Sequence, residues 1–585
     1  MMIAPTPTKN ATLPHVACRF ETLTDGLDYA ARGETGYNYY SVRGELVLAL
    51  PYAELRERSV ALARRLVGMG LEKGARVGLI ADTSAAFHTF FFGCQYAGLI
   101  PVPLPLPVNL GGRESYVRQL RRMLESADAA MAVAPAELVA MLQEAAGDFI
   151  PHIGGPDDFA DQPETGALRI PGKDDPCYIQ YSSGSTSAPK GVLVTQRSAL
   201  ANTGAISRYG LMLAPGDRCI SWLPLYHDMG LVGFCFTPML NQITIDYMST
   251  MDFARRPLAW LQLIARNRGT VAFSPSFGYD LCARRAANGA AADLDLSAWR
   301  VAGIGGDMVR ADVLDRFVET FGGNGFRRST FVPSYGLAES TLAVTFAPLS
   351  EDFRTDTIDR EALATSGEAV PVGPEAGEDG RTFVVCGSVM SGHALRIVGD
   401  SGEPRADRQV GRVLIKGPSL MSGYFRNAEA TAAAFATEGW LDTGDLGYMV
   451  DGELVITGRS KDLIISNGRN IWPQDIEWSV ERLPGLRQGD AAAFSVVDTD
   501  GDEAVIVVVQ CRLSEPAARD RLRRQIHAMV RDSVGIDANI VLAPPHSLPH
   551  TSSGKLSRAG TRANFLAGAY TPAHRDAGLK LAAEG

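Results

Sequence analysis

Tyr181-Ser182-Ser183-Gly184-Ser185-Thr186-Ser187-Ala188-Pro189-Lys190-Gly191 brings hydroxyl side chains, two glycines and a lysine together in one loop. Glycine lets the backbone approach an anion closely, hydroxyls add hydrogen-bond donors, and a lysine adds a point charge. The stretch therefore predicts a polyphosphate cradle, formed by Ser182, Ser183, Gly184, Ser185, Thr186 and Lys190. The preceding segment, 177–180, predicts a short strand that leads into the loop.

The loop differs from the commonest nucleotide-binding pattern. G-x-x-x-x-G-K-[ST] requires a Ser or Thr after the lysine, and Gly191 occupies that position. The stretch is therefore another kind of phosphate loop, and an ordinary Ser/Gly linker is the alternative interpretation.

Length and composition limit the class of protein. A chain of 585 residues is too long for one hydrophobic core and predicts at least two domains. Its 46% hydrophobic and 21% charged residues are typical of a globular protein. A net charge of -10 and a pI near 5.5 argue against binding to nucleic acid or to anionic membranes, whose phosphates would repel the chain.

The eight cysteines include no C-x-x-C pair, so the sequence predicts neither a zinc site nor a disulfide framework, but buried, reduced thiols. The segment 1–7 lacks the basic region and the apolar run of a signal peptide. The most apolar stretch, 90–108, is interrupted by Gln95, Gly98 and four prolines, so no membrane span is predicted. We expect a cytoplasmic protein.

Periodicity predicts an α/β fold with parallel strands. Apolar residues recur at helical spacing over 52–69, and two glycines then lead into a strand at 76–80. Similar alternation continues further along the chain, which favours α/β layers. The strand-like pieces 395–398 and 411–415 predict a small β-rich subdomain.

The C-terminal part has a different pattern. From Asp462 onward, a β-rich run at 503–513 and an amphipathic helix at 517–534 predict a separate α+β domain. The polar segment 351–381 resembles a surface insertion, and a tolerated long loop is its alternative interpretation. We therefore expect a large domain at 1–460 and a small domain at 461–585.

Several short motifs lie downstream of the loop, and each alone has an ordinary structural interpretation. In 334–341, an aromatic ring and a carboxylate lie four residues apart, with a tight turn between them. Glycine-flanked Asp445 lies in a predicted turn at 442–447, a geometry suited to accepting two hydrogen bonds from a ribose diol, although a turn-forming Asp is the simpler interpretation. A hairpin-type turn at 451–453 precedes the charged run 458–462.

Together, these motifs resemble the adenylate-forming superfamily of acyl-CoA synthetases, luciferases and adenylation domains of peptide synthetases. The resemblance is greatest to the fatty acyl-AMP ligases, through the stretches 226–230, 277–282 and 470–477 and the insertion near 351–381. It extends from about Tyr52 to about Arg558. It implies a large domain of α/β subdomains and a β-rich subdomain, with a small mobile C-terminal domain.

The resemblance implies that ATP and Mg²⁺ bind at these motifs. Tyr335 would stack on adenine, Glu339 and Thr186 would hold Mg²⁺, and Thr341 would contact the α-phosphate region. The other face of adenine would meet the glycine-rich loop 303–308, where close backbone approach needs glycine. The residues expected to contact the nucleotide also include Ser334, Gly336, Gly305, Gly306, Asp307, Asp445 and Arg459.

The catalytic roles are also implied by resemblance. Lys555 matches the catalytic lysine of the family, which stabilises the transition state between a carboxylate and the α-phosphate. Lys461 matches the hinge between the two domains. His227 resembles a position beside the reacting carboxylate, although a core histidine is the alternative.

The acid-binding wall is expected to be apolar or aromatic, with no carboxylate placed to hold an α-ammonium, which favours a fatty or aryl acid. Its expected residues are Tyr226, His227, Met229, Phe277 and Tyr279, and the stretch 273–281 is expected to form the wall of the acid pocket. The implied partner is an acyl carrier protein or a carrier domain of a polyketide or peptide synthase, which would receive the acyl group on its phosphopantetheine thiol. A fatty acyl-CoA ligase and a noncatalytic nucleotide-binding scaffold are the alternatives.

Overall fold

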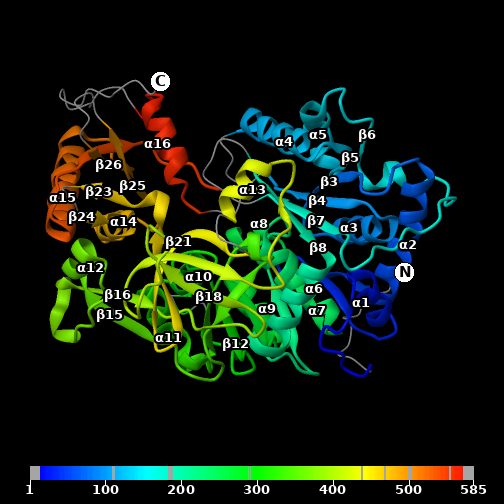
Figure 1. Cartoon of the computed structure of the whole chain (residues 1–585), viewed down its shortest axis with the longest axis horizontal. Coiled ribbons are helices and arrows are strands. Elements are labelled where there is room, and N and C mark those ends of the chain that lie inside the picture. Colours follow the sequence, from blue (N-terminus) through cyan, green and yellow to red (C-terminus); the bar gives the residue numbers. More distant parts are fainter. Residues whose placement is uncertain are drawn as a thin grey trace.

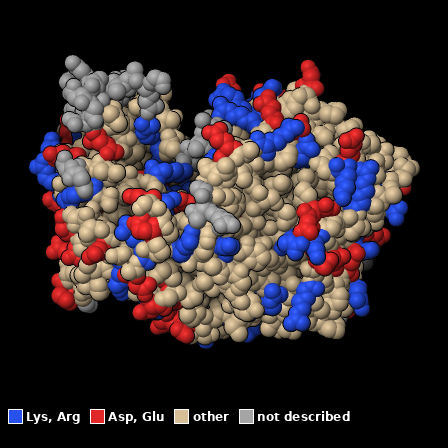
Figure 2. Space-filling model, in the orientation of Figure 1, with Lys and Arg blue, Asp and Glu red and all other residues tan. Residues whose placement is uncertain are grey.

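The computed structural model describes residues 13–107, 112–181, 189–286, 289, 291–435, 439–466, 469–497, 503–551 and 555–570. N-terminal elements lie at one end of the molecule and the C-terminal elements at the other, with the central sheet and its helices between them (Figure 1). Figure 2 shows acidic and basic side chains interspersed over this face.

A nine-stranded sheet forms the centre of the fold, in the order β17-β14-β13-β12-β11-β9-β10-β1-β2. Strands β1, β10, β9, β11, β12 and β13 are parallel, and the outer strands are antiparallel. The carboxyl ends of the parallel strands therefore meet at one edge, where ligands bind in open α/β sheets. The strands are β1 (Gly36–Tyr40), β2 (Leu46–Pro51), β9 (Arg218–Ser221), β10 (Thr244–Met248), β11 (Val271–Ser274), β12 (Val301–Ile304), β13 (Phe331–Gly336), β14 (Ala343–Phe346) and β17 (Ser388–Val389).

A second, parallel sheet has the order β4-β3-β5-β6, and β20-β8-β7 form a third. The helix predicted at 52–69 and the strand at 76–80 are confirmed as α2 and β3, and the α/β class is correct. The elements are α2 (Tyr52–Gly68), β3 (Arg76–Ile80), α3 (Ala85–Ala97), β4 (Ile100–Leu104), α4 (Arg113–Ala127), β5 (Ala129–Val133), α5 (Val139–Ala146), β6 (His152–Gly154), β7 (Pro176–Tyr181), β8 (Gly191–Thr195) and β20 (Gly423–Tyr424).

Helices cover the central sheet, and two of them contain π-helical turns. The π-helix η3 (Ile206–Gly210) continues α6, and the π-helix η4 (Met229–Phe236) runs into α7. π-Helical turns are rare in proteins as a whole, but those that do occur often lie at functional sites. The other helices are α1 (Leu23–Ala30), α6 (Gln196–Ala205), α7 (Thr237–Leu240), α8 (Thr250–Arg255), α9 (Leu258–Asn267), α10 (Ser276–Ala286), α11 (Ala311–Phe321) and α13 (Ala428–Ala434).

The predicted β-rich subdomain is an antiparallel sheet of β18 (Ala394–Val398), β19 (Gly411–Lys416), β21 (Leu441–Val450) and β22 (Glu453–Arg459). Its predicted hairpin turn is confirmed, because Asp451 and Gly452 have φ angles of 54° and 80°. The turn predicted at 442–447 is wrong. This segment lies inside β21, where Gly444 adopts a φ of 71° and the pairing with β19 and β22 is irregular.

The polar segment 351–381 is folded and packs against the C-terminal part of the chain. It contributes β15 (Thr355–Asp359), α12 (Arg360–Ser366) and the start of β16 (Gly380–Val384), and β15 and β16 form an antiparallel pair. Arg381 is buried and forms an ion pair with Asp475, with Nε 2.9 Å from Oδ1. Glu361 forms another with Arg469. The segment therefore bridges two parts of the molecule.

The C-terminal part is an α+β unit with the sheet β25-β26-β27 and the hairpin β23-β24. The predicted amphipathic helix is confirmed as α15, which buries Leu522, Ile526, Val530 and Val534 at helical spacing. The β run predicted to reach 513 ends at Gln510. The elements are β23 (Ile464–Ser466), β24 (Arg469–Ile471), α14 (Pro473–Glu481), β25 (Ala491–Val497), β26 (Glu503–Gln510), α15 (Pro516–Val534), β27 (Asn539–Ala543) and α16 (Arg558–Leu566).

All eight cysteines lie in the described part of the chain, where each is buried and none forms a disulfide. Within the described ranges, no helix has both the length and the hydropathy that a bilayer crossing requires. The described part of the apolar stretch, 90–107, contributes to helix α3 and strand β4, inside the α/β layers.

Gly230 in η4 provides a test of this packing. A Cβ atom there would lie 2.1 Å from the carbonyl oxygen of Pro224, whereas a Cβ at Gly233 would first meet a Leu342 methyl at 3.4 Å. We therefore expect Gly230→Ala to lower the free energy of unfolding by about 1–3 kcal/mol or more, the usual cost of overpacking. Urea unfolding followed by circular dichroism measures this, with Gly233→Ala as the matched control. Equal stability of the two variants would contradict the packing described.

Candidate active site

A cavity of about 430 Å³, the first cavity, brings together polar residues from distant parts of the sequence, including four cationic side chains, a histidine and a carboxylate. They come from the start of β8, the turn before η4, the 3₁₀ turn η7 (Ala338–Ser340), the end of β22, the 3₁₀ turn η9 (Ser460–Asp462) and the loop before α16. These residues are Lys190, His227, Glu339, Arg459, Lys461 and Lys555. Loops at the carboxyl ends of the parallel strands are where this fold places ligands.

A second cavity of about 420 Å³ shares part of its lining with the first and lies between the large part of the chain and the C-terminal part. Asp307, Phe277 and Asp445 line the second cavity. The residues that line both are Gly306, Ser334, Tyr335, Gly336, Arg459, Lys461 and Lys555. The two cavities therefore form one continuous site.

Asp445 connects two strands that line this site. The Tyr335 hydroxyl donates to its Oδ2 at 2.7 Å, and Arg459 Nε donates to its Oδ1 at 3.0 Å. The Asp445 carboxylate raises the pKa of Arg459, and burial raises the pKa of Tyr335 well above its ordinary value. These two charged and polar donors hold the carboxylate in one orientation, although the predicted turn around it is absent.

Glu339 lies in the turn η7, and its Oε1 accepts a hydrogen bond of 2.8 Å from the Tyr424 hydroxyl. The Lys190 ammonium lies 5.1 Å from the centre of the Tyr424 ring. Burial raises the pKa of Glu339, which the Tyr424 hydroxyl partly offsets. Tyr424 therefore holds both an anion and a cation of the site. Sequence reasoning missed it, since no motif surrounds it.

Asp228 is a second residue whose role the sequence did not indicate. His227 Nδ1 lies 2.6 Å from Asp228 Oδ1, which also accepts from the Met229 N–H at 2.7 Å. Burial alone would raise the pKa of Asp228, but His227, Lys555 and this N–H together hold it below its ordinary value. Because Nδ1 is engaged, Nε2 is the His227 nitrogen available to a ligand. The only signal in the sequence was the position of Asp228 directly after His227.

Lys555 reaches into the site from the C-terminal part of the chain. Its Nζ lies 4.0 Å from the point that a Cβ at Gly306 would occupy, beside the Met229 side chain. A backbone hydrogen bond holds Lys555 in place, because the Thr551 N–H donates to the Lys555 carbonyl at 2.7 Å. Burial, together with the Arg459 charge, lowers the pKa of Lys461. With Lys190 and Arg459, Lys461 and Lys555 make four cationic side chains in the first cavity, an arrangement suited to a polyanion.

Some predicted residues lie elsewhere. Ser182, Ser183, Gly184, Ser185 and Thr186 fall outside the described residues. Thr341 is buried, and its hydroxyl donates to the Ser419 carbonyl at 2.7 Å, away from both cavities. Tyr226 is also buried outside the two linings, with its carbonyl accepting from Gln180. Gly305 lies against Ser334, with a Cβ position 2.7 Å from its carbonyl oxygen.

Tyr279, predicted to wall the acid pocket, lies in the aromatic core. It is fully buried, its hydroxyl donates to the Gly303 carbonyl at 2.9 Å, and its ring meets Phe317 and Phe331 edge to face. Helix α10 turns this side chain toward the sheet and turns Phe277 toward the second cavity. The motif predicted an aromatic wall but could not distinguish the two faces of the helix.

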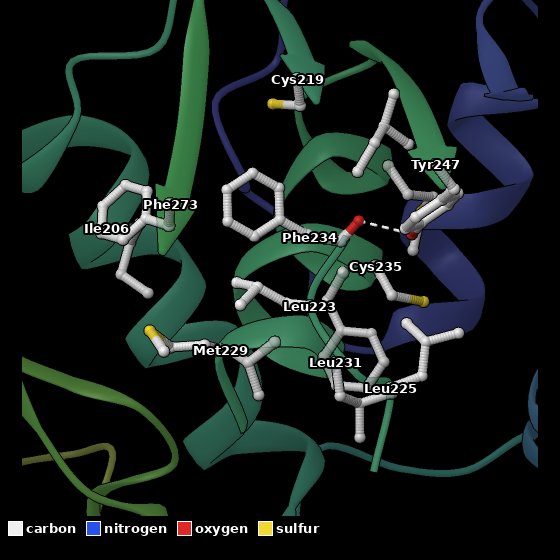
Figure 3. Close-up of a cluster of buried hydrophobic side chains, with 14 of the residues drawn as sticks. Ile206, Cys219, Leu223, Leu225, Met229, Leu231, Phe234, Cys235, Tyr247 and Phe273 are labelled. Carbon is white, nitrogen blue, oxygen red and sulfur yellow. Dashed lines mark hydrogen bonds between the residues drawn. The ribbon is translucent and has the colours of Figure 1, made fainter. Parts of the chain in front are cut away.

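The first cavity also has an apolar part, here called the apolar pocket. Figure 3 shows Ile206 and Phe273 next to each other, with the Phe234 ring beside them and 5.8 Å from Phe273 between ring centres. Tyr247 anchors the π-helix η4, because its hydroxyl donates to the Phe234 carbonyl at 2.6 Å. The pocket residues are Ile206, Leu211, Met229, Gly233, Phe234, Phe273, Leu342, Ala343 and Phe346. Of these, the sequence had predicted Met229 and, through the stretch 273–281, Phe273.

Comparison with known proteins agrees with this geometry. The family model of the AMP-binding enzymes matches residues 46–425. A putative acyl-CoA synthetase of Caulobacter vibrioides is 49% identical over 94% of this chain and 96% of its own length. A medium-chain fatty acid–acyl carrier protein ligase of Moorena producens is 34% identical over the same shares. A solved fatty acyl-adenylate ligase, from work on the E. coli and L. pneumophila enzymes, has a TM-score of 0.91 and 46% identity, over 95% of this chain and 100% of its own.

The fold and the site define an enzyme of the adenylate-forming ligase class. The chain belongs to the family of AMP-binding enzymes.

The placement of Tyr279 can be tested by removing its hydroxyl. We expect Tyr279→Phe to lower the free energy of unfolding by about 1–3 kcal/mol, because the buried hydrogen bond from the Tyr279 hydroxyl to the Gly303 carbonyl is lost. The affinity for nucleotide should stay unchanged, because Tyr279 lines neither cavity. Tyr335→Phe is the matched variant, since it loses a hydroxyl inside the site and should weaken nucleotide binding. Titration calorimetry and urea unfolding measure both effects, and weaker nucleotide binding by Tyr279→Phe would contradict the placement.

Proposed function

We propose that the protein activates a fatty acid with ATP and releases pyrophosphate. The observation that carries this proposal is the first cavity, in which cationic and carboxylate side chains adjoin an apolar pocket. A molecule with an anionic head and an apolar tail matches this division, because the pocket can bury methylene groups while lysines face the head. The names of the Moorena and solved relatives support the same substrate class.

The residues of the site fit ATP with Mg²⁺. Tyr335 presents an aromatic ring beside glycine backbone at Gly306, and the oriented Asp445 carboxylate can accept from a ribose diol. Arg459 and Lys190 would face the phosphates, with the predicted loop of Ser182 to Thr186. The Glu339 carboxylate is an oxygen ligand suited to Mg²⁺, with Thr186 as its predicted companion. The ion, when bound, would neutralise phosphate charge.

The reaction would join the two anions directly. A carboxylate oxygen attacks the α-phosphorus of ATP and forms an O–P bond, the bond to the bridging oxygen breaks, and pyrophosphate leaves with that oxygen. Lys555 would lie between carboxylate and α-phosphate and stabilise the charge that develops there. His227, oriented by Asp228 through Nδ1, would face the carboxylate with the Nε2 edge of its ring and help to position it for attack.

For the second step, we propose transfer to an acyl carrier protein. The thiol of a phosphopantetheine group loses its proton to solvent and its sulfur attacks the acyl carbon. A thioester forms, the bond from that carbon to the phosphate oxygen breaks, and AMP leaves with that oxygen. We also propose that residues 1–460 and 461–585 form two domains with Lys461 as the hinge. Apolar cores composed only of residues from Ile464 onward support this division. The ion pairs of the 351–381 segment with the C-terminal part would restrain rotation.

Replacing the catalytic lysine tests the first step. We expect Lys555→Ala to lower acid-dependent exchange of labelled pyrophosphate into ATP by roughly 10²–10³-fold, because this ammonium acts on charge that appears in the transition state. Calorimetry should give an ATP affinity close to that of the parent. Lys173→Ala, which changes an exposed lysine, is the control. Unchanged exchange would remove Lys555 from the mechanism, and no exchange by the parent with any acid would favour the scaffold alternative.

The choice of acceptor needs a separate experiment. The enzyme is incubated with ATP, a fatty acid and either CoA or a phosphopantetheinylated carrier protein, and products are separated by mass spectrometry. We expect acyl-carrier protein as the main product. The Caulobacter relative is named a putative acyl-CoA synthetase, so acyl-CoA is the specific competing product. Robust formation of acyl-CoA would overturn the acceptor assignment and leave the first step intact.

A further inference from the structure

Arg558 lies three residues after Lys555, at the first position of helix α16. Each of its three guanidinium nitrogens donates to a carboxylate. Nε and Nη2 lie 2.7 Å from the two oxygens of Glu477, and Nη1 lies 3.0 Å from Asp462 Oδ2. The side chains of Arg558 and Glu477 are 19% and 4% exposed. A bidentate pair of this kind fixes the orientation of the guanidinium as well as its distance from the carboxylate.

The backbone joins Arg558 closely to Lys555. The Ser557 N–H donates to the Pro549 carbonyl at 2.9 Å, and the Thr551 N–H donates to the Lys555 carbonyl at 2.7 Å. These two bonds connect the segment before Lys555 to the segment after it. A shift of Arg558 would therefore move Lys555 with it.

Glu477 belongs to helix α14, which is held against the rest of the molecule on two sides. Arg310, in the large part of the chain, donates from Nη1 to Glu481 Oε2 at 3.3 Å, and its guanidinium lies 5.0 Å from the centre of the Trp478 ring. Glu477 Oε1 also accepts from the Ala493 N–H of strand β25 at 3.0 Å. Helix α14 thus supports the Lys555 loop from a position fixed relative to the large part.

Asp462, the second partner, ends the turn η9, directly after Lys461. Both residues line the second cavity, together with Glu477, Lys555 and Arg558. Burial alone would lower the pKa of Arg558, but Glu477 and Asp462 hold it above its ordinary value. The two carboxylates therefore compensate for the burial of this charge, and the guanidinium links the Lys555 loop to the turn that carries Lys461.

We propose that Arg558 is a positioning residue for Lys555, and that its pairs with Glu477 and Asp462 set where the lysine ammonium lies in the site. This inference rests on the proposed function, since it takes Lys555 as the group that stabilises the transition state. A displacement of about 1 Å in such a group can lower the rate on the order of 10²-fold. Loss of the pair should therefore lower kcat and leave the ATP affinity close to that of the parent.

The test uses Arg558→Lys and Glu477→Gln, which remove the bidentate pair from either side while changing the size of the side chain little. We expect each variant to lower kcat for pyrophosphate exchange by about 10–100-fold, with an ATP affinity by calorimetry close to that of the parent. In the Lys555→Ala background, the same changes should cause no further loss, because Arg558 acts through that lysine. A merely structural role would instead lower exchange by the same factor with and without Lys555.

Arg512→Lys is the matched control. Arg512 forms a bidentate pair with Asp490 in the same C-terminal part, at 2.5 and 3.0 Å, and these two residues lie outside both cavity linings. The control should lower the free energy of unfolding in urea but keep the parent kcat.

Parent kcat in Arg558→Lys and Glu477→Gln, or an equal loss with and without Lys555, would overturn the inference. If one of the two variants fails to fold, as judged by circular dichroism, the other decides the result. Parent exchange in Lys555→Ala, or no exchange by the parent with any acid, would instead overturn the proposed function.

Discussion

The site depends on the burial of charged groups that come from distant parts of the chain and must neutralise one another. Asp445 accepts from Tyr335 and Arg459, and Asp228 lies with His227 and close to the Lys555 charge. A buried carboxylate without such partners would cost several kcal/mol of desolvation. The loops of the parallel sheet, the β-rich subdomain and the C-terminal part are therefore held in one arrangement around the site.

The same constraint explains why a polar centre can adjoin an apolar pocket. The π-helix η4 carries Asp228 at its amino end and Phe234 further along, so one element supplies both the charged centre and the apolar wall. Close packing of Gly230 against the Pro224 carbonyl fixes the turn that joins them. The charged centre and the apolar wall are thus held in a fixed position relative to each other by one helical element.

Much of this arrangement could be predicted from the sequence. Periodicity identified α2, β3, α15 and the α/β class, because a buried stripe at 3.6 or 2 residues is a local property. The family resemblance carried by the motifs pointed to Tyr335, Glu339, Asp445, Arg459 and Lys555, and the structure brings them to one continuous site. Tyr424 and Phe346 were missed, because their function arises only from what packs against them.

The amino-acid sequence by itself determined the residue types that a nucleotide and a carboxylate require, since hydroxyls, glycines and charged groups have their chemistry wherever they lie. Tertiary structure alone decided which side chains reach the cavity. Tyr279 and Phe277 stand two residues apart, yet one enters the core and the other lines the second cavity. Helical spacing separates two faces, but what covers each face depends on the packing of distant strands and helices, and that is a property of the whole fold.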